Sequence, residues 1–425
     1  MRLLFVFLIL LLATVQVTNA QTQVYSAYEL LDSIGVNIHL HYTDTPYNDF
    51  AELIKPKLLE LGIKHVRDGV YTYDGINADT FYYKRLRELV DEGIKLDLIT
   101  GMETQWGEAT DYSLLPQIYD WTNGGVVSFE GINEPDLQGV EDWVEVTRAA
   151  QQTLYETVKN EPKLADVAVL GPSPAFEGAK LGDLNAYMDY GNIHPYPGGK
   201  MPTGDENNQS TRRELERVSS VSADKPVMIT ETGYHTALKT ESDHLPTSES
   251  AAAKYIPRLF LDAFERGVPR TYLYEFLSTQ GDRDTNPEGA FGLLRRDGSE
   301  TPAYTSLQTM LKVLAQAEPL ENLTELDYTL GGPTEDLQTL LLQVDETRYV
   351  LALWLERSSW DRQARQDISV APEPLTLSFG KRLSVSSYLL DGGLQNEDAV
   401  TELAVEEPLT LAVSDAVTLL ELKLN

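Results

Sequence analysis

Between residues 30 and 318, short apolar runs alternate with longer stretches in which apolar residues recur every three or four positions. The short runs are typical of strands buried on both faces, and the longer stretches of amphipathic helices. Eight such cycles follow one another at intervals of roughly 25 to 45 residues, enough for one helix after each strand. The pattern predicts an α/β fold, a (β/α)8 TIM barrel.

The predicted strands are residues 34–39, 64–67, 96–101, 125–130, 167–171, 191–194, 226–231 and 271–275. The predicted helices are residues 47–61, 80–91, 140–160, 212–219, 248–266 and 303–316. In the helix at 140–160, we expect Trp143, Val146, Ala150, Leu154 and Val158 to face the barrel. The third and fifth crossovers have weaker periodicity, which allows irregular loops there.

After residue 318 the pattern changes to strand-like runs separated by turn residues. These runs are residues 337–343, 348–355, 375–379, 383–390, 409–413 and 417–422. The absence of a convincing helical stretch between them predicts a small all-β sandwich over residues 319–425, after a barrel over residues 21–318. Residues 21–28 are a candidate for one further strand of the sandwich.

The first twenty residues have the pattern of a secretory signal peptide. Arg2 precedes an apolar run from Leu3 to Val15, and small or polar residues follow up to Ala20. The run is about 13 residues long, whereas a membrane-spanning helix needs about 20. We expect cleavage near Ala20, a secreted or periplasmic location and no membrane association afterwards.

Charge and cysteine content narrow the possible partners. The formal net charge of −32 excludes nucleic acid and disfavours strongly anionic polymers, unless a local basic pocket attracts them. Neutral partners fit better. The chain has no cysteine, so a large apolar core rather than disulfides must stabilise the fold.

Two of the predicted strands end in glutamates. The segment VVSFEGINEPD contains Asn133, Glu134 and Pro135 after the fourth strand, and PVMITETGYH places Glu231 at the end of the seventh. Active sites of barrels form at the carboxyl ends of the strands, so both side chains converge on one pocket. Such a pair suits glycoside hydrolysis, because one carboxyl protonates the leaving oxygen while the other attacks the anomeric carbon.

On these residues, the barrel resembles clan A of the glycoside hydrolases. The clan has Asn-Glu-Pro at strand four and a glutamate at the end of strand seven, matched here by Asn133, Glu134, Pro135 and Glu231. The resemblance implies that Glu134 is the acid/base and Glu231 the nucleophile of a retaining enzyme. It also implies an oligosaccharide or polysaccharide substrate and neither a metal nor another cofactor.

Further positions match the clan one by one. Arg67 ends the second strand and would brace the nucleophile, and Asn133 would contact the 2-hydroxyl of the sugar. His194 and Tyr196 in NIHPYPGG resemble the clan's His-x-Tyr, whose tyrosine hydrogen-bonds the nucleophile. Each also has a structural interpretation, as an ion pair for Arg67 and as core packing for His194 and Tyr196.

Candidate sugar-stacking residues follow three predicted strands: Trp106, Tyr234 and Phe276. The clan often has a tryptophan at the end of strand eight, where this chain has Glu275 and Phe276 in YLYEFLS. Glu275 is therefore a candidate third acidic group near the sugar. Glu130, four residues before Glu134, is expected to lie deeper and to be structural.

Two alternatives remain open. His39 and His41 in NIHLHY form a His-x-His at the end of the first strand, as in metal-dependent hydrolases of the amidohydrolase type, although only His194 could complete such a site. In the glycosidase interpretation, His39 is a substrate contact instead. The second alternative is a barrel that binds carbohydrate without catalysis.

Overall fold

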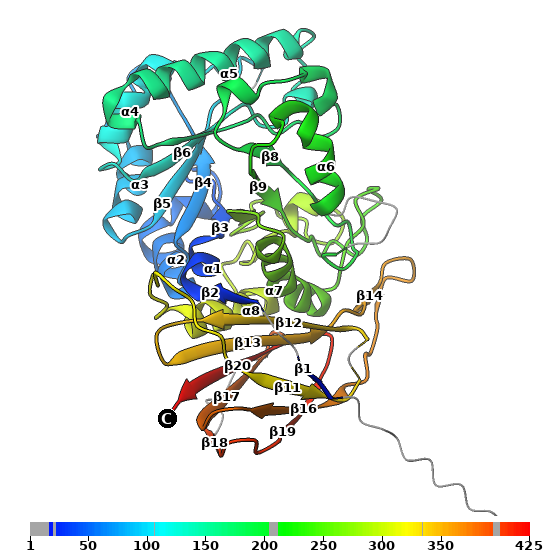
Figure 1. Cartoon of the computed structure of the whole chain (residues 1–425). Coiled ribbons are helices and arrows are strands. Elements are labelled where there is room, and N and C mark those ends of the chain that lie inside the picture. Colours follow the sequence, from blue (N-terminus) through cyan, green and yellow to red (C-terminus); the bar gives the residue numbers. More distant parts are fainter. Residues whose placement is uncertain (1–16, 20–22, 106, 204–210, 334, 394–399) are drawn as a thin grey trace, which may run out of the picture.

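The computed structural model describes residues 17–19, 23–105, 107–203, 211–333, 335–393 and 400–425. Figure 1 shows a barrel with helices around it and, below it, two layers of mostly antiparallel strands. The predicted barrel followed by a sandwich is therefore confirmed.

The barrel is an eight-stranded parallel sheet in the order β7-β6-β5-β4-β3-β10-β9-β8. Its strands are β3 (Ile34–Asn37), β4 (His65–Gly69), β5 (Lys95–Ile99), β6 (Val126–Glu130), β7 (Ala168–Leu170), β8 (Gly191–Ile193), β9 (Val227–Thr232) and β10 (Thr271–Leu273). A parallel bridge between Leu170 and Tyr190 joins the two ends of this order. All eight predicted strands are confirmed, and the first residue of each lies within one position of the observed first residue.

Helices cover the outside of the barrel. They are α1 (Ala27–Asp32), α2 (Lys55–Leu61), α3 (Phe81–Asp91), α4 (Leu115–Trp121), α5 (Trp143–Asn160), α6 (Thr211–Ser222), α7 (Glu249–Glu265) and α8 (Pro302–Leu314). Local sequence explains several of the ends: Ser248 caps α7 through the amide of Ala251, and Thr301 caps α8 through the amide of Tyr304, with Pro302 in the first turn.

The predicted helix at 47–61 is only partly regular. Its first turns are a 3-10 turn (Pro46–Asn48) and a π-helical turn (Phe50–Ile54), and α2 follows directly. The third crossover contains α4, a helix of seven residues that the weak periodicity did not predict. The fifth crossover has only 3-10 turns (Gly178–Leu181 and Asn185–Tyr187) between β7 and β8.

The buried face of α5 differs from the predicted one. Thr147 and Gln151 are buried, whereas Val146 and Ala150 are half-exposed. The reason is the short fifth crossover: the side-chain amide of Gln151 donates to the carbonyls of Leu170 (3.1 Å) and Tyr187 (2.8 Å). These carbonyls need a donor, so a polar side chain replaces an apolar one on this face.

The C-terminal strands form two sheets. The six-stranded sheet has the order β18-β17-β20-β13-β12-β2, and the four-stranded sheet the order β1-β11-β16-β19. The strands are β1 (Val17–Asn19), β2 (Val24–Ser26), β11 (Tyr328–Gly331), β12 (Leu337–Gln343), β13 (Arg348–Leu355), β16 (Glu373–Phe379), β17 (Leu383–Leu390), β18 (Thr401–Leu403), β19 (Leu409–Val413) and β20 (Val417–Leu424). All six predicted runs are strands, and residues 21–28 contribute β2, which pairs with β12 in parallel.

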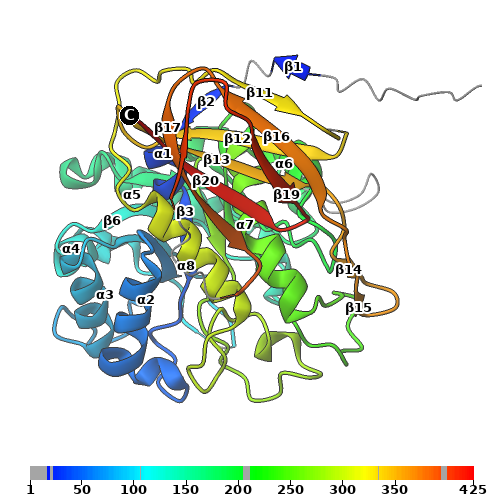
Figure 2. The same cartoon turned by 90° about the horizontal axis from the view of Figure 1, so that it is seen from below.

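The sandwich and the barrel share one apolar core. Residues of β12, β13 and β20 pack in the same buried cluster as residues of α7 and α8, and Figure 2 shows the sandwich lying across these helices. Arg258 of α7, 1% exposed, crosses the junction, where it donates to Glu356 Oε1 (2.6 Å) and to the Arg357 carbonyl (3.0 Å).

A hairpin of β14 (Trp360–Asp361) and β15 (Gln366–Asp367) extends from the sandwich along the barrel (Figure 1). The indole of Trp360 donates to the Pro246 carbonyl at 2.8 Å, and Arg365 donates to the Thr240 carbonyl at 2.9 Å. These contacts hold the hairpin against the loop that follows β9.

Most of the predicted signal peptide lies outside the described residues. The exception is β1, which pairs antiparallel with β11, so cleavage near Ala20 would remove this strand from the four-stranded sheet. No helix in the described part of the chain is long and apolar enough to cross a membrane.

Candidate active site

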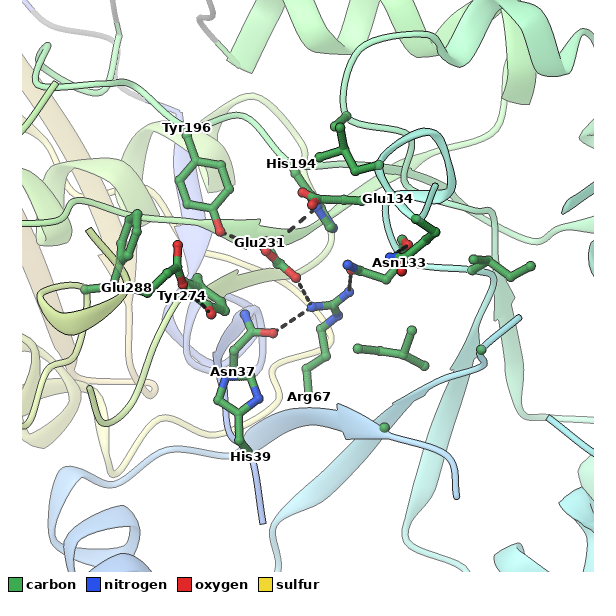
Figure 3. Close-up of a pocket in the computed structure, with 18 of the residues that line it drawn as sticks. Asn37, His39, Arg67, Asn133, Glu134, His194, Tyr196, Glu231, Tyr274 and Glu288 are labelled. Carbon is green, nitrogen blue, oxygen red and sulfur yellow. Dashed lines mark hydrogen bonds and ion pairs between the residues drawn. The ribbon is translucent and has the colours of Figure 1, made fainter. Parts of the chain in front are cut away.

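A cavity of about 1290 Å³ opens at the carboxyl ends of the barrel strands. Its lining includes the side chains predicted at the ends of strands β4, β6, β8 and β9, which Figure 3 shows: Arg67, Glu134, His194 and Glu231. The loops after all eight barrel strands contribute to its lining, and Arg362 of the β14–β15 hairpin lines it as well. The sandwich therefore contributes directly to the cavity.

Glu134 reaches the cavity because the chain turns sharply after β6. Asn133 forms a parallel bridge with Ser173, and Glu134 has a left-handed backbone (φ 42°, ψ 54°) before the 3-10 turn Pro135–Leu137. A non-glycine residue adopts this conformation mainly where the surroundings hold it, often at a functional site. Gly131 permits the close approach of this segment to the chain after β7, because a Cβ on Gly131 would lie 2.7 Å from the Pro172 nitrogen.

Glu231 lies on β9, and both of its oxygens have a donor. Arg67 Nη1 donates to Oε1 at 2.6 Å, and the Tyr196 hydroxyl donates to Oε2 at 2.8 Å. Burial alone would raise the pKa of Glu231. Electrostatic interactions with His194 and Arg67 and these two hydrogen bonds outweigh burial and lower the pKa to about 2. Glu231 is therefore ionised at neutral pH.

Arg67 is the centre of a buried hydrogen-bond network. Besides Glu231, it donates to both oxygens of Glu130 (2.7 and 2.8 Å), to Asn37 Oδ1 (2.8 Å) and to Asn133 Oδ1 (2.7 Å). The planar guanidinium satisfies four side chains at once, from β3, from β9, and from β6 and the turn that follows it. Glu130 is fully buried and does not line the cavity, so its role is to hold Arg67.

His194 lies between the two candidate catalytic carboxylates. Its Nδ1 is 3.0 Å from Glu134 Oε1 and 3.8 Å from Glu231 Oε2, and its Nε2 is 3.0 Å from Thr230 Oγ1. One carboxylate oxygen of each glutamate and one ring nitrogen of His194 lie within 4.8 Å of one another. The two carboxyl groups thus share one pocket, as the sequence predicted.

This trio is also the one group of three potential metal ligands among the described residues. Arg67 and Tyr196 already donate to both oxygens of Glu231, so a cation would have to compete with a guanidinium. His39 and His41 do not converge on a metal position. His41 stacks on Tyr71 with ring centroids 4.0 Å apart, whereas His39 Nε2 lies 3.1 Å from Glu275.

The structure brings most of the predicted residues together. Those that line the cavity are His39, Arg67, Asn133, Glu134, His194, Tyr196 and Glu231. Trp106 lies outside the described residues. Tyr234 is buried outside the cavity, where its ring packs 5.4 Å from that of Tyr255, because the chain leaves the rim after Gly233. Glu275 and Phe276 are also fully buried and do not line the cavity.

Cavity residues that were missed at the sequence level include Asn37, Tyr274 and Glu288. Asn37 lies two positions before His39 and accepts from Arg67. Tyr274 lines the cavity in the place where stacking by Phe276 was expected, and its hydroxyl donates to Glu288 at 3.0 Å. Alternation along β3 could have indicated Asn37, whereas Glu288 comes from a long loop whose path the sequence pattern does not specify.

No protein-family model matches the chain, and no curated protein matches it in sequence. Solved structures match the chain in fold. A family 39 glycoside hydrolase from Bacteroides cellulosilyticus WH2 is 17% identical over 95% of this chain and 83% of its own, with a TM-score of 0.57. A glucosidase from Croceicoccus marinus is 13% identical over 88% and 92%, with a TM-score of 0.59.

A family 30 endoxylanase from Clostridium papyrosolvens C71 is 14% identical over 96% of this chain and 99% of its own, with a TM-score of 0.56. Identities this low relate the proteins by fold. The resemblance predicted from the two glutamate motifs is confirmed at that level: the chain shares the barrel-and-sandwich fold of these glycoside hydrolases.

Proposed function

We propose that this protein is a retaining glycoside hydrolase that cleaves O-glycosidic bonds of a neutral oligosaccharide or polysaccharide by double displacement. The fold alone does not carry this proposal, because barrels host many activities. It rests on one observation: Glu134 and Glu231 lie on either side of His194, and one carboxylate oxygen of each glutamate and one ring nitrogen of His194 lie within 4.8 Å of one another.

The spacing of the carboxylates favours retention of configuration. Retaining enzymes hold the two carboxyl groups about 5 to 5.5 Å apart, whereas inverting enzymes need about 6.5 to 9.5 Å to admit a water. In the first step, Glu231 attacks the anomeric carbon while Glu134 gives its proton to the leaving oxygen. In the second step, Glu134 takes a proton from water, and the resulting hydroxide displaces Glu231 from the sugar.

The surroundings of each glutamate suit its role. Arg67 and Tyr196 keep Glu231 ionised and aim it, as a nucleophile requires. Glu134 is one quarter exposed to the cavity, and its contact in the described residues is the His194 ring rather than a permanent cation. It can therefore exchange a proton with the substrate and with water.

Asn133 and Tyr274 are the proposed sugar contacts beside the catalytic pair. Because Asn133 Oδ1 accepts from Arg67, its amide nitrogen is left to donate to the 2-hydroxyl of the sugar. Tyr274 presents an aromatic ring in the wall of the cavity, suited to the apolar face of a pyranose. We also propose export through the leader at residues 1–20, which fits an enzyme acting on external glycans.

Two substitutions test the roles of the glutamates. We expect Glu231→Ala to lose turnover of aryl glycosides and azide to rescue it, giving a glycosyl azide of the opposite anomeric configuration. Glu134→Ala should retain activity on aryl glycosides with good leaving groups, and azide should give the azide of the substrate's configuration. Wild-type rates in both variants would refute the proposal, and saccharide binding without turnover in the wild type would favour a non-catalytic barrel.

A further inference from the structure

Glu275 is a buried carboxylate that takes no part in the proposed double displacement. Its side chain is 1% exposed, lies behind the cavity wall, and accepts no hydrogen bond from a described residue through either oxygen. An unpaired carboxylate in such a place is costly, so it must either hold a proton or face a cation.

The partner that the structure provides is His39. Its Nε2 lies 3.1 Å from Glu275 Oε2, close enough for an ion pair although not aligned as a hydrogen bond. Nε2 is buried, whereas 19% of the His39 side chain is exposed and lines the cavity. One edge of the ring therefore faces Glu275 and another part faces the cavity.

Aromatic rings fix the orientation of His39. The imidazole stacks on Tyr42, with centroids 4.8 Å apart and planes 7° apart, and meets the edges of Tyr47 and Tyr274 at 5.8 Å each. The ring has little freedom to turn between these neighbours. It is a rigid element of the cavity wall, close to Asn37 and Arg67 in Figure 3.

The charges around the pair are mostly negative. From the neighbouring elements, Asp68, Glu231 and Glu288 face His39 or Glu275, and the phenols of Tyr42, Tyr47 and Tyr274 surround them. Burial raises the pKa of Glu275 to about 7, and Glu275 raises the pKa of His39 although burial opposes this. The pair therefore retains a proton near neutral pH.

We propose that Glu275 is a positioning residue that keeps His39 protonated and aimed into the cavity, where His39 donates a hydrogen bond to a hydroxyl of the sugar whose glycosidic bond is cleaved. The proposal deepens the proposed function and rests on it. Because three further carboxylates face this wall, a sugar carboxylate would be repelled here. The substrate class is a neutral sugar, not a uronic acid.

Kinetics on monodeoxy aryl glycosides test the contact. For the sugar that the enzyme prefers, removal of the contacted hydroxyl should lower kcat/KM of the wild type by about tenfold to a hundredfold. In Glu275→Gln and His39→Gln, KM on the parent glycoside should rise more than kcat falls. In these variants, removal of the same hydroxyl should lower kcat/KM only slightly further. The matched control is Asp262→Asn, another buried carboxylate, which lies on α7 away from the cavity and should behave as wild type.

Nitrogen NMR of histidine-labelled protein gives a readout that a merely structural role would not move. The chain has six histidines, and the spectrum of His39→Gln assigns the signals of His39. In the wild type, His39 should titrate above its ordinary pKa. In Glu275→Gln it should titrate lower, and kcat/KM should fall over the same pH range as His39 loses its proton. If Glu275→Gln does not fold, the wild type and His39→Gln still decide the outcome.

Three results would overturn the proposal: a neutral His39 in the wild type at pH 6, equal deoxy penalties in wild type and His39→Gln at every position, or faster hydrolysis of the aryl uronide than of the matching neutral glycoside. Failure of the proposed function is distinct, because it would appear as wild-type activity in Glu231→Ala and Glu134→Ala.

Discussion

The barrel and the sandwich have interiors of different composition. The barrel strands bury Arg67, Asp97, Glu130 and Glu231 within or at the ends of their hydrogen-bonded segments. In the described sandwich strands, the buried polar side chains are Ser26, Gln343 and Thr418, and none of the three is ionisable. The same chain thus contains one interior organised around charge and one that is almost entirely apolar.

The difference separates function from stability. Burying charged groups is unfavourable unless each is paired, and Arg67 pairs with two of the buried barrel carboxylates, Glu130 and Glu231. Such an arrangement is retained where it orients reactive groups. Within the described sandwich strands there is no such network, and the largely buried ion pairs of this domain, Asp415 with Lys254 and Glu356 with Arg258, lie where it meets α7. The described strands therefore contribute mainly packing. Substitutions in the two interiors should therefore have different signatures in kinetics and in unfolding.

The largest effect is expected at Arg67. Arg67→Met leaves Glu130 and Glu231 buried without their cation, which should cost about 3 to 5 kcal/mol of unfolding free energy. It should also lower kcat by about a hundredfold to a thousandfold, because Glu231, the proposed nucleophile, loses its orientation and its low pKa. Urea unfolding and aryl-glycoside kinetics measure the two effects.

The control is Arg270→Met, at the opposite end of the barrel, where Arg270 pairs with Asp32 at 3.0 Å. It should reduce stability and leave kcat unchanged. Equal losses of kcat in the two variants would mean that the network at Arg67 has no special connection with the chemistry.

A smaller effect, on stability alone, is expected in the sandwich. Leu353→Ala on β13 removes a fully buried side chain and should cost about 2 to 5 kcal/mol of unfolding free energy with unchanged kcat. Leu389→Ala on β17, where the side chain is 37% exposed, is the matched control and should cost less. A loss of kcat in the folded Leu353→Ala protein would contradict the separation between the two interiors.

The smallest effect concerns Asp97, a barrel carboxylate away from the cavity. Burial, and then the nearby charge of Glu130, raise the pKa of Asp97 from 3.8 to about 7. Since the folded form then binds more protons than the unfolded form, this residue's contribution to stability is present below pH 3.8 and is lost as the pH rises towards 7.

Asp97→Asn removes this titration, so its stability should vary less between about pH 4 and pH 7. At pH 8 the variant should be more stable than the wild type, by about 1 to 2 kcal/mol. Urea unfolding across this pH range measures the difference, with the exposed Asp120→Asn as control. A variant that loses stability relative to wild type at pH 8 would show that the carboxylate is favourable as an anion.

Much of this fold could be predicted from the sequence, because each barrel strand is a short apolar run between helical stretches and each sandwich strand is bounded by turns. Two helix predictions failed, for different reasons that the apolar pattern does not reveal. Gln151 is buried on α5 because carbonyls of a short crossover need a donor. Helix α4 is too short to show helical periodicity.

The candidate site divides in the same way. Strand ends position Arg67, Glu134 and Glu231, so their meeting in one cavity follows from barrel geometry. Side chains beyond the strand ends could not be placed from alternation. Tyr234 turns into the core, and Glu288 enters the cavity from a distant loop. The sequence indicated the importance of Glu275 but not that it lies behind His39.

The most direct test of the central claim is to identify the residue that becomes covalently bound to the sugar. The enzyme would be inactivated with a 2-deoxy-2-fluoro glycoside carrying a good leaving group, chosen from the aryl glycoside that it hydrolyses fastest, and then mapped by peptide mass spectrometry. Double displacement predicts one fluoroglycosyl group per chain, attached to Glu231. An adduct on another residue, or continued turnover of substrate without any adduct, would contradict the claim.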